Sequence, residues 1–122
     1  MRRREFAKLI DVTADAAYVV DESGAIVAWN AAAEVFFGIT AAEAIGHPCW
    51  KVIHGFDECG MICSDQCVVQ QSVARRMPVA NFDIRVQTVK GCVWCNMSVM
   101  IAECRESSKA CSIHLLRPDD VR

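Results

Sequence analysis

Long apolar runs are missing from this sequence, and a secretory signal is missing as well. No stretch of the 122 residues approaches the roughly 18 consecutive apolar residues that a membrane-spanning helix needs. The basic start, Arg2 to Arg4, is not followed by the apolar region of a signal peptide, because Asp11 and Asp15 interrupt it. We therefore expect a cytoplasmic protein without membrane contact.

A strong excess of charge, internal repeats and low-complexity segments are also missing. The formal net charge of −2 gives no reason to expect direct nucleic-acid contact by this segment. The apolar fraction of 53% excludes a disordered chain. The length fits one domain, which can bury about two-thirds of the surface that its unfolded chain exposes. Such a domain needs no metal simply to have a core.

Cysteine is what the sequence has in abundance, with eight in all. Four of them, Cys49, Cys59, Cys63 and Cys67, fall within nineteen residues at the spacing C-x9-C-x3-C-x3-C. Thiolates are soft ligands that suit zinc, copper(I) and iron–sulfur clusters. Cysteine is also a small hydrophobe that is often buried, but four so close together fit that alternative poorly. In a reducing cytosol we expect them to bind metal or to be redox-active.

The remaining cysteines are interpreted mainly as packing residues. Cys92-x-x-Cys95 has a zinc-ribbon spacing, but it falls inside a predicted strand, where side chains three residues apart point to opposite faces. Cys95 and Cys111 lie on apolar strand faces, so we expect both to be buried. Cys104 borders a polar loop, and we expect its side chain to be exposed.

Hydrophobic periodicity predicts an α+β domain whose helices are grouped in the middle of the chain. Asn30 and Thr40 are expected as helix N-caps, with Glu43 completing a capping box; Gly38 should end a helix and Ser64 should begin one. The predicted helices cover residues 3–12, 31–37, 41–45 and 64–76. The predicted strands cover residues 17–21, 25–29, 79–89, 92–103 and 110–117.

These elements carry a family resemblance. The run GAIVAWNAAAEVFFGITAAEAIGHPCW resembles the front half of a PAS sensor domain, in which a hairpin leads into an N-x-A-A-E-x-x-F-G helix and then a T-x-x-E-x-I-G helix. The final strands, ending in HLLRPDD, fit the same family, so the resemblance covers about residues 4–120. It implies a five-stranded antiparallel sheet in the order 2-1-5-4-3, with short helices over one face and a ligand cavity beneath them.

The resemblance also implies a role and a set of partners. It suggests a sensory module, not an enzyme, that forms homodimers and serves a signalling output domain outside this chain, for example one in transcription regulation. On this interpretation residues 1–15 are an N-terminal helix and lead-in, residues 16–118 the sensor domain, and residues 119–122 the exit. Phe6, Leu9 and Ile10 should place the first helix on the outer sheet face or on a partner.

The cysteine stretch resembles a narrower group of bacterial PAS domains with the pattern C-W/Y-x-V followed by G-x-D-x-x-G-x-x-C-x-x-x-C. Cys59 falls within that pattern without being clearly part of it, and the matching positions here are Cys49, Trp50, Val52, Gly55, Asp57, Gly60, Cys63 and Cys67. The N-C-R-F-L-Q signature of flavin photosensors and the C-x-x-C-H signature of covalent haem are absent.

Our leading hypothesis is a redox-responsive iron–sulfur cluster held by Cys49, Cys59, Cys63 and Cys67. A structural zinc site closed by four protein ligands is the first alternative, and a metal-free dimerisation module with reversible disulfides is the second. His54, inside the stretch, is the first substitute ligand. His114 is interpreted as facing away from the cavity, on the side of Ala110 and Ser112, and becomes a ligand only if that face assignment is reversed.

Overall fold

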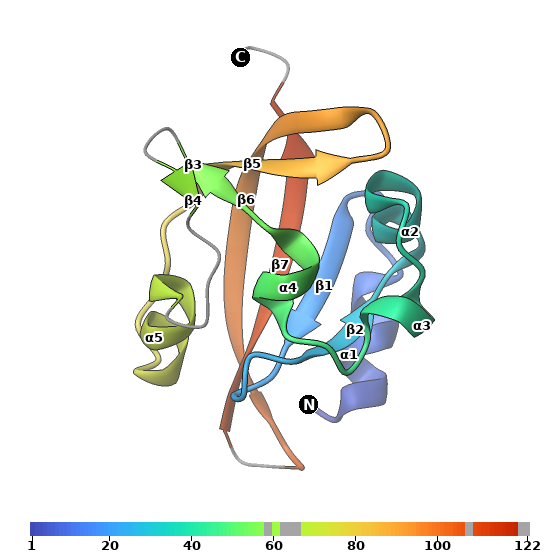
Figure 1. The fold of residues 1–122 in the computed structure, drawn as a ribbon. Helices are drawn as coiled ribbons and strands as arrows, with labels where there is room; N and C mark the ends of the chain where they lie inside the picture. The colour runs from blue at the N-terminus through green and yellow to red at the C-terminus, as the bar shows by residue number, and fades with distance from the viewer. Residues whose placement is uncertain (58–59, 62–66, 107–108, 120–122) are drawn as a thin grey trace.

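An antiparallel sheet forms the centre of the molecule (Figure 1). The computed structural model describes residues 1–57, 60–61, 67–106 and 109–119. The predicted Ser64 cap lies outside these residues. The strands are β1 (Ala16–Val20), β2 (Ile26–Trp29), β3 (Phe56–Asp57), β4 (Gly60–Met61), β5 (Phe82–Thr88), β6 (Gly91–Cys104) and β7 (Lys109–Pro118). They lie in the order β2-β1-β7-β6-β5-β3-β4.

The five longer strands have the predicted connectivity. Counted by themselves, β1, β2, β5, β6 and β7 follow the order 2-1-5-4-3, which confirms the fold expected from the sequence. The two-residue strands β3 and β4 were not expected. They extend the sheet beyond β5, through a single pairing of Phe56 with Arg85, and bring the start of the cysteine stretch to the sheet edge.

Helices cover both faces of the sheet. Their bounds are α1 (Arg3–Ile10), α2 (Ala31–Phe37), α3 (Ala41–Ala44), α4 (Cys49–Ile53) and α5 (Val68–Ala74). In Figure 1, α4 lies across the middle of the sheet, with α2 and α3 towards β2 and α5 on the opposite side. Helix α1 packs on the other face, so the chain has an inner face under α2–α5 and an outer face under α1.

Strand periodicity divides the core into two clusters, one on each face. Tyr18 and Val20 point inward, whereas Ala17 and Val19, which alternate with them, point outward, and all four are fully buried. The inner cluster also contains Trp29, Phe37, Ile53, Ile84, Val86, Cys95, Met97 and Leu116. The outer cluster contains Phe6 and Ile10 of α1 with Ala28, Cys104, Cys111 and Ile113. A strand that alternates in this way can be buried on both sides.

Two helix boundaries follow the predicted chemistry. Thr40 caps α3, its Oγ1 accepting from Glu43 N at 3.2 Å while the Glu43 carboxylate accepts from Thr40 N at 3.1 Å. Gly38 ends α2 at φ 71°, and a Cβ there would stand 2.6 Å from Val89 Cγ1. Both the left-handed backbone and the close approach therefore require glycine.

Two helices differ from the prediction. Of the helix expected over residues 64–76, the structure shows Val68–Ala74 with Cys67 as the N-cap, and residues 64–66 lie outside the described part of the chain. Residues 49–53 form a helix, α4, that was not predicted from the sequence. The apolar residues Trp50, Val52 and Ile53 were equally consistent with a hydrophobic surrounding for the cysteine ligands. Pro48 is the N-cap of that helix, and its fixed φ of −60° suits this position.

The Asn30 side chain joins four elements of the fold. Its Oδ1 accepts hydrogen bonds from Ala33 N at 2.9 Å and from Ala17 N at 3.0 Å. Its Nδ2 donates to Ile10 O at 2.8 Å and to Asp15 O at 3.0 Å. The residue is 2% exposed. It therefore caps α2, as predicted, and also fastens the end of α1 and the start of β1 to the end of β2.

We expect Asn30→Ala to lower the free energy of unfolding by about 3 kcal/mol or more, because it removes a cap and leaves buried backbone groups without partners. Thr40→Ala, which removes an exposed cap, should cost about 1 kcal/mol. Urea denaturation of both variants measures the difference. Equal losses in the two variants would contradict the role assigned to Asn30.

Candidate functional site

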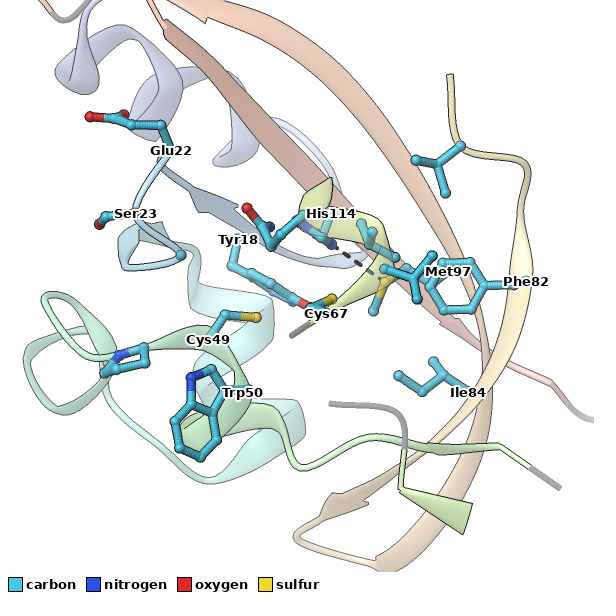
Figure 2. Close-up of a pocket in the computed structure, with 16 residues that line it drawn as sticks. Tyr18, Glu22, Ser23, Cys49, Trp50, Cys67, Phe82, Ile84, Met97 and His114 are labelled. Atoms are coloured by element: carbon cyan, nitrogen blue, oxygen red, sulfur yellow. Dashed lines mark hydrogen bonds between the residues drawn. The ribbon is translucent and has the colours of Figure 1, made fainter. Parts of the chain in front are cut away.

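A cavity of about 630 Å³ opens between the inner sheet face and helices α4 and α5 (Figure 2). Tyr18 of β1, Met97 of β6 and His114 of β7 line the sheet side, whereas Cys49 and Cys67 line the helical side. We call this space the inner cavity. Most of its described lining is apolar, and the remaining lining residues are Glu22, Ser23, Gly24, Pro48, Trp50, Val68, Val69, Gln70, Val79, Phe82 and Ile84.

The structure brings two of the four predicted cysteine ligands to one cavity. Cys49 is the first residue of α4, and its backbone N–H donates to Gly24 O at 2.8 Å, which anchors the helix start on the β1–β2 turn. Cys67 directly precedes α5. Both side chains are half-buried on the cavity wall, as Figure 2 shows. Cys59 and Cys63 lie outside the described residues.

Two thiols are half of the four thiolates that most iron–sulfur clusters require. Within residues 1–57, 60–61, 67–106 and 109–119, no three His, Cys, Asp or Glu side chains are grouped closely enough to hold a metal ion. The described residues thus supply two soft donors, and the cluster hypothesis depends on Cys59 and Cys63 for the other two.

His114 lies on the inner face, which corrects the prediction that it faces away from the cavity. The strand β7 is buried on both faces over this stretch, so alternation of apolar and polar residues did not distinguish inside from outside. The His114 ring stacks on Tyr18, with ring centroids 4.7 Å apart and ring planes 6° from parallel. Burial lowers the pKa of His114 to about 3, so the imidazole is neutral at physiological pH.

A series of polar contacts runs from α5 along the inner face of β7 to His114. Gln70 Nε2 donates to Ser112 Oγ at 3.4 Å, and Ser112 Oγ lies 2.8 Å from His114 Nε2. His114 Nδ1 lies 3.4 Å from Met97 Sδ, the contact drawn as a dashed line in Figure 2. Ser112 and His114 are 0% and 3% exposed. Buried polar groups in a chain of this kind satisfy one another.

The other candidate ligand, His54, is placed differently. It ends α4 as an exposed residue with a left-handed backbone, at φ 49°. A non-glycine residue in that conformation is uncommon. His54 is the C-cap of α4, and it is absent from the described lining of the inner cavity.

The remaining cysteines fall into buried and exposed groups. Cys92 is exposed and Cys95 buried, so the C-x-x-C pair points to opposite faces, as predicted. Burial raises the pKa of Cys95 to about 11 and that of Cys111 to about 12, which keeps both as thiols. The expectation that Cys104 is exposed was wrong. Its side chain is 3% exposed because α1 covers the end of β6 and places it beside Cys111.

Sequence reasoning missed Tyr18, Gln70 and Met97 as residues that line the inner cavity. It also missed Ser112, which is buried and contacts His114. One signal could have found His114, the β7 residue in the described lining of the inner cavity. Ser112 and His114 are polar residues two positions apart, on one face of a mainly apolar strand. Such a pair suggests a buried hydrogen bond.

Stability should depend on pH through His114. Its folded-state pKa is lower than the unfolded value of 6.5, so the unfolded chain binds more protons between those values and stability falls as pH falls. We expect a loss of about 2 kcal/mol between pH 7 and pH 5 from this residue. Urea denaturation at both values measures it. His114→Phe should show a smaller loss, and an unchanged pH dependence in that variant would contradict the assignment.

Comparisons with known proteins agree on the fold. The solved PAS domain of a protein from Colwellia psychrerythraea is 21% identical, with a TM-score of 0.68, and the match covers 98% of each chain. The RpfR quorum-sensing receptor PAS domain from Cronobacter turicensis, in complex with C12:0, is 14% identical with a TM-score of 0.68, covering 87% of this chain and 94% of that one.

The PAS domain of nitrogen regulation protein NR(II) from Vibrio parahaemolyticus is 15% identical, with a TM-score of 0.67, and the match covers 93% of this chain and 96% of that one. No curated protein matches the chain. In the described part of the chain, no helix has the length and apolarity to cross a membrane. The family model described as the PAS fold matches residues 4–109. This chain therefore belongs to the PAS family of sensory, signal-transduction domains.

Proposed function

We propose that this domain is the sensory input of a signal-transduction protein and that the signal acts at the inner cavity. The observation that supports this is the position of the cavity. One wall is the hydrogen-bonded sheet, and the other consists of α4 and α5, which are short helices of five and seven residues. A group bound between them can shift these helices at little cost, because short helices are held mainly by packing.

Our first candidate for the sensing group is a redox-responsive iron–sulfur cluster held by Cys49, Cys59, Cys63 and Cys67. Its support is that Cys49 and Cys67, from separate elements, line one cavity. When bound, such a cluster would supply sensitivity to oxidants. Trp50 and Phe82 on the cavity wall would limit the access of water to the ligands. A structural zinc ion and a metal-free reversible disulfide are the alternatives for the same thiols.

The chain itself suggests how a change at the cysteines would be transmitted. Cys67 directly precedes α5, and α5 packs against β7, where Gln70 reaches Ser112. A Cys67 side chain held by ligation fixes the first turn of α5 against the sheet. Released or oxidised, Cys67 no longer restrains that turn. The short helix can then change its contact with β7 and pass the signal to an output domain outside this chain.

Metal content of protein purified without oxygen tests the first candidate. We expect iron and sulfide in the parent chain, with visible absorbance, and their loss in Cys49→Ser and Cys67→Ser. Cys92→Ser is the matched control, because Cys92 is exposed and far along the chain from the cysteine stretch, and it should bind the same amount of iron.

Colourless protein with one zinc per chain would favour the structural alternative. Metal bound equally by Cys67→Ser and the parent would contradict a thiolate site at this cavity. Because ligated thiolates can contribute on the order of 10 kcal/mol to folding, the two ligand variants should also melt at lower temperature if the site is occupied.

The second candidate for the sensing group is an apolar small molecule in the inner cavity. A volume of about 630 Å³ with mostly apolar walls is typical of ligand pockets, which measure roughly 300–1,000 Å³. The structurally similar RpfR domain was solved with C12:0 and with BDSF. Both observations favour an acyl-sized, hydrophobic ligand here.

We also propose that the domain forms a homodimer through α1. Phe6 and Ile10 are buried against the domain's own sheet, whereas Leu9 is 43% exposed. We expect Leu9→Lys to weaken self-association in analytical ultracentrifugation at tens of micromolar without lowering stability. Exposed Val12→Lys is a control on the adjoining turn. A parent chain that is monomeric under these conditions would contradict the proposal.

A further inference from the structure

The protonation of His114 follows from its two ring contacts. Met97 Sδ is a thioether, which has no proton to donate, so the 3.4 Å contact with Nδ1 is attractive only when Nδ1 carries the proton. The ring is buried and neutral, and Nε2 is therefore an acceptor. Ser112 must then donate its hydroxyl proton to Nε2 across 2.8 Å. Ser112 Oγ can still accept a hydrogen bond from Gln70 Nε2 at 3.4 Å. Each hydrogen bond from Gln70 to Met97 therefore has one donor and one acceptor.

This arrangement leaves a good donor bonded to a weak acceptor. The Nδ1–H group of His114 is directed at a thioether sulfur, which accepts hydrogen bonds only weakly. Both His114 and Met97 line the inner cavity, as Figure 2 shows. Methionine has three rotatable bonds and can move aside easily. A ligand oxygen that reaches His114 would therefore exchange a weak contact for a stronger one.

The charges of the lining residues indicate whether the ligand oxygen is charged or neutral. Among the described lining residues there is no lysine or arginine, and the one ionisable carboxylate is Glu22. A neutral imidazole gives no cation to balance a ligand carboxylate. Aromatic and aliphatic side chains such as Tyr18, Phe82 and Ile84 provide most of the remaining surface. An uncharged ligand with one acceptor oxygen fits this lining better than an anion does.

We propose that the inner cavity binds an uncharged, largely apolar molecule through a carbonyl-type oxygen that accepts a hydrogen bond from His114 Nδ1. This inference rests on the second candidate function, an apolar small molecule in the cavity. This oxygen would replace Met97 Sδ as the acceptor at Nδ1. Ser112 and Gln70 act as positioning residues, because their hydrogen bonds keep the His114 proton on Nδ1, the nitrogen that contacts Met97.

The test compares two probes of the same shape, 2-octanone and 2-methyl-1-octene, in which a C=CH2 group replaces the C=O group. Their affinities for the full chain are measured by NMR titration in the parent, His114→Phe and Met97→Leu. His114→Phe should weaken ketone binding about five- to tenfold and leave alkene binding unchanged, because only the ketone loses a hydrogen bond. Met97→Leu should strengthen ketone binding about threefold or more, because His114 Nδ1–H then has no partner to give up.

Three outcomes separate the possibilities. Equal loss of both probes in His114→Phe would overturn the carbonyl inference and leave the apolar ligand function standing. Failure of both probes to bind the parent would overturn the carbonyl inference and the apolar ligand function together. Nitrogen-15 spectra of the His114 imidazole in the parent give a check that needs no variant to fold. A proton on Nδ1 whose chemical shift changes when ketone is added supports the proposal. A proton on Nε2 overturns it.

Discussion

The buried amide of Asn30 is the interaction on which the rest of the structure depends. It stands where β2 ends and α2 begins, and its four hydrogen bonds reach α1, the lead-in to β1, β1 itself and α2. A buried amide keeps all its hydrogen bonds only when its partner groups stand in one arrangement, and losing any of them leaves a buried polar group unpaired. Asn30 therefore sets the position of both helical layers relative to β1, the strand that carries Tyr18 into the inner cavity.

The inner cavity combines a rigid wall with a weakly held one. Strands β1, β7 and β6 pair continuously, so Tyr18, His114 and Met97 are fixed by backbone ladders as well as by their own contacts. Helices α4 and α5 are short, and the thiols at their starts face the same space. A sensor needs this combination, because a binding site that is rigid on all sides gives no displacement to transmit.

The eight cysteines serve at least two physical roles. Cys95, Cys104 and Cys111 are buried in the two core clusters, where a small, weakly polar side chain packs like any hydrophobe. Burial raises the pKa of Cys95 and Cys111, which removes the thiolate that metal binding and oxidation require. Cys49 and Cys67 are only half-buried, at a cavity. Among the cysteines in the described part of the chain, the proposed ligand chemistry involves this second group.

By itself the sequence determined the caps at Asn30 and Thr40 and the glycine stop at Gly38, because these depend on local spacing and on short-range backbone chemistry. The strand order was implied by the resemblance to the PAS family, because the pairing of strands that are distant in the chain does not follow from local spacing. The sequence also singled out Cys49 and Cys67. Only the tertiary structure decided that His114 faces the cavity, because β7 is buried on both sides and its alternation carries no sign of which face is inner. The same holds for Cys104, which neighbours a polar loop in sequence but lies under α1 in space. Contacts between elements distant in the chain, such as Gln70 with Ser112, leave no local pattern to read.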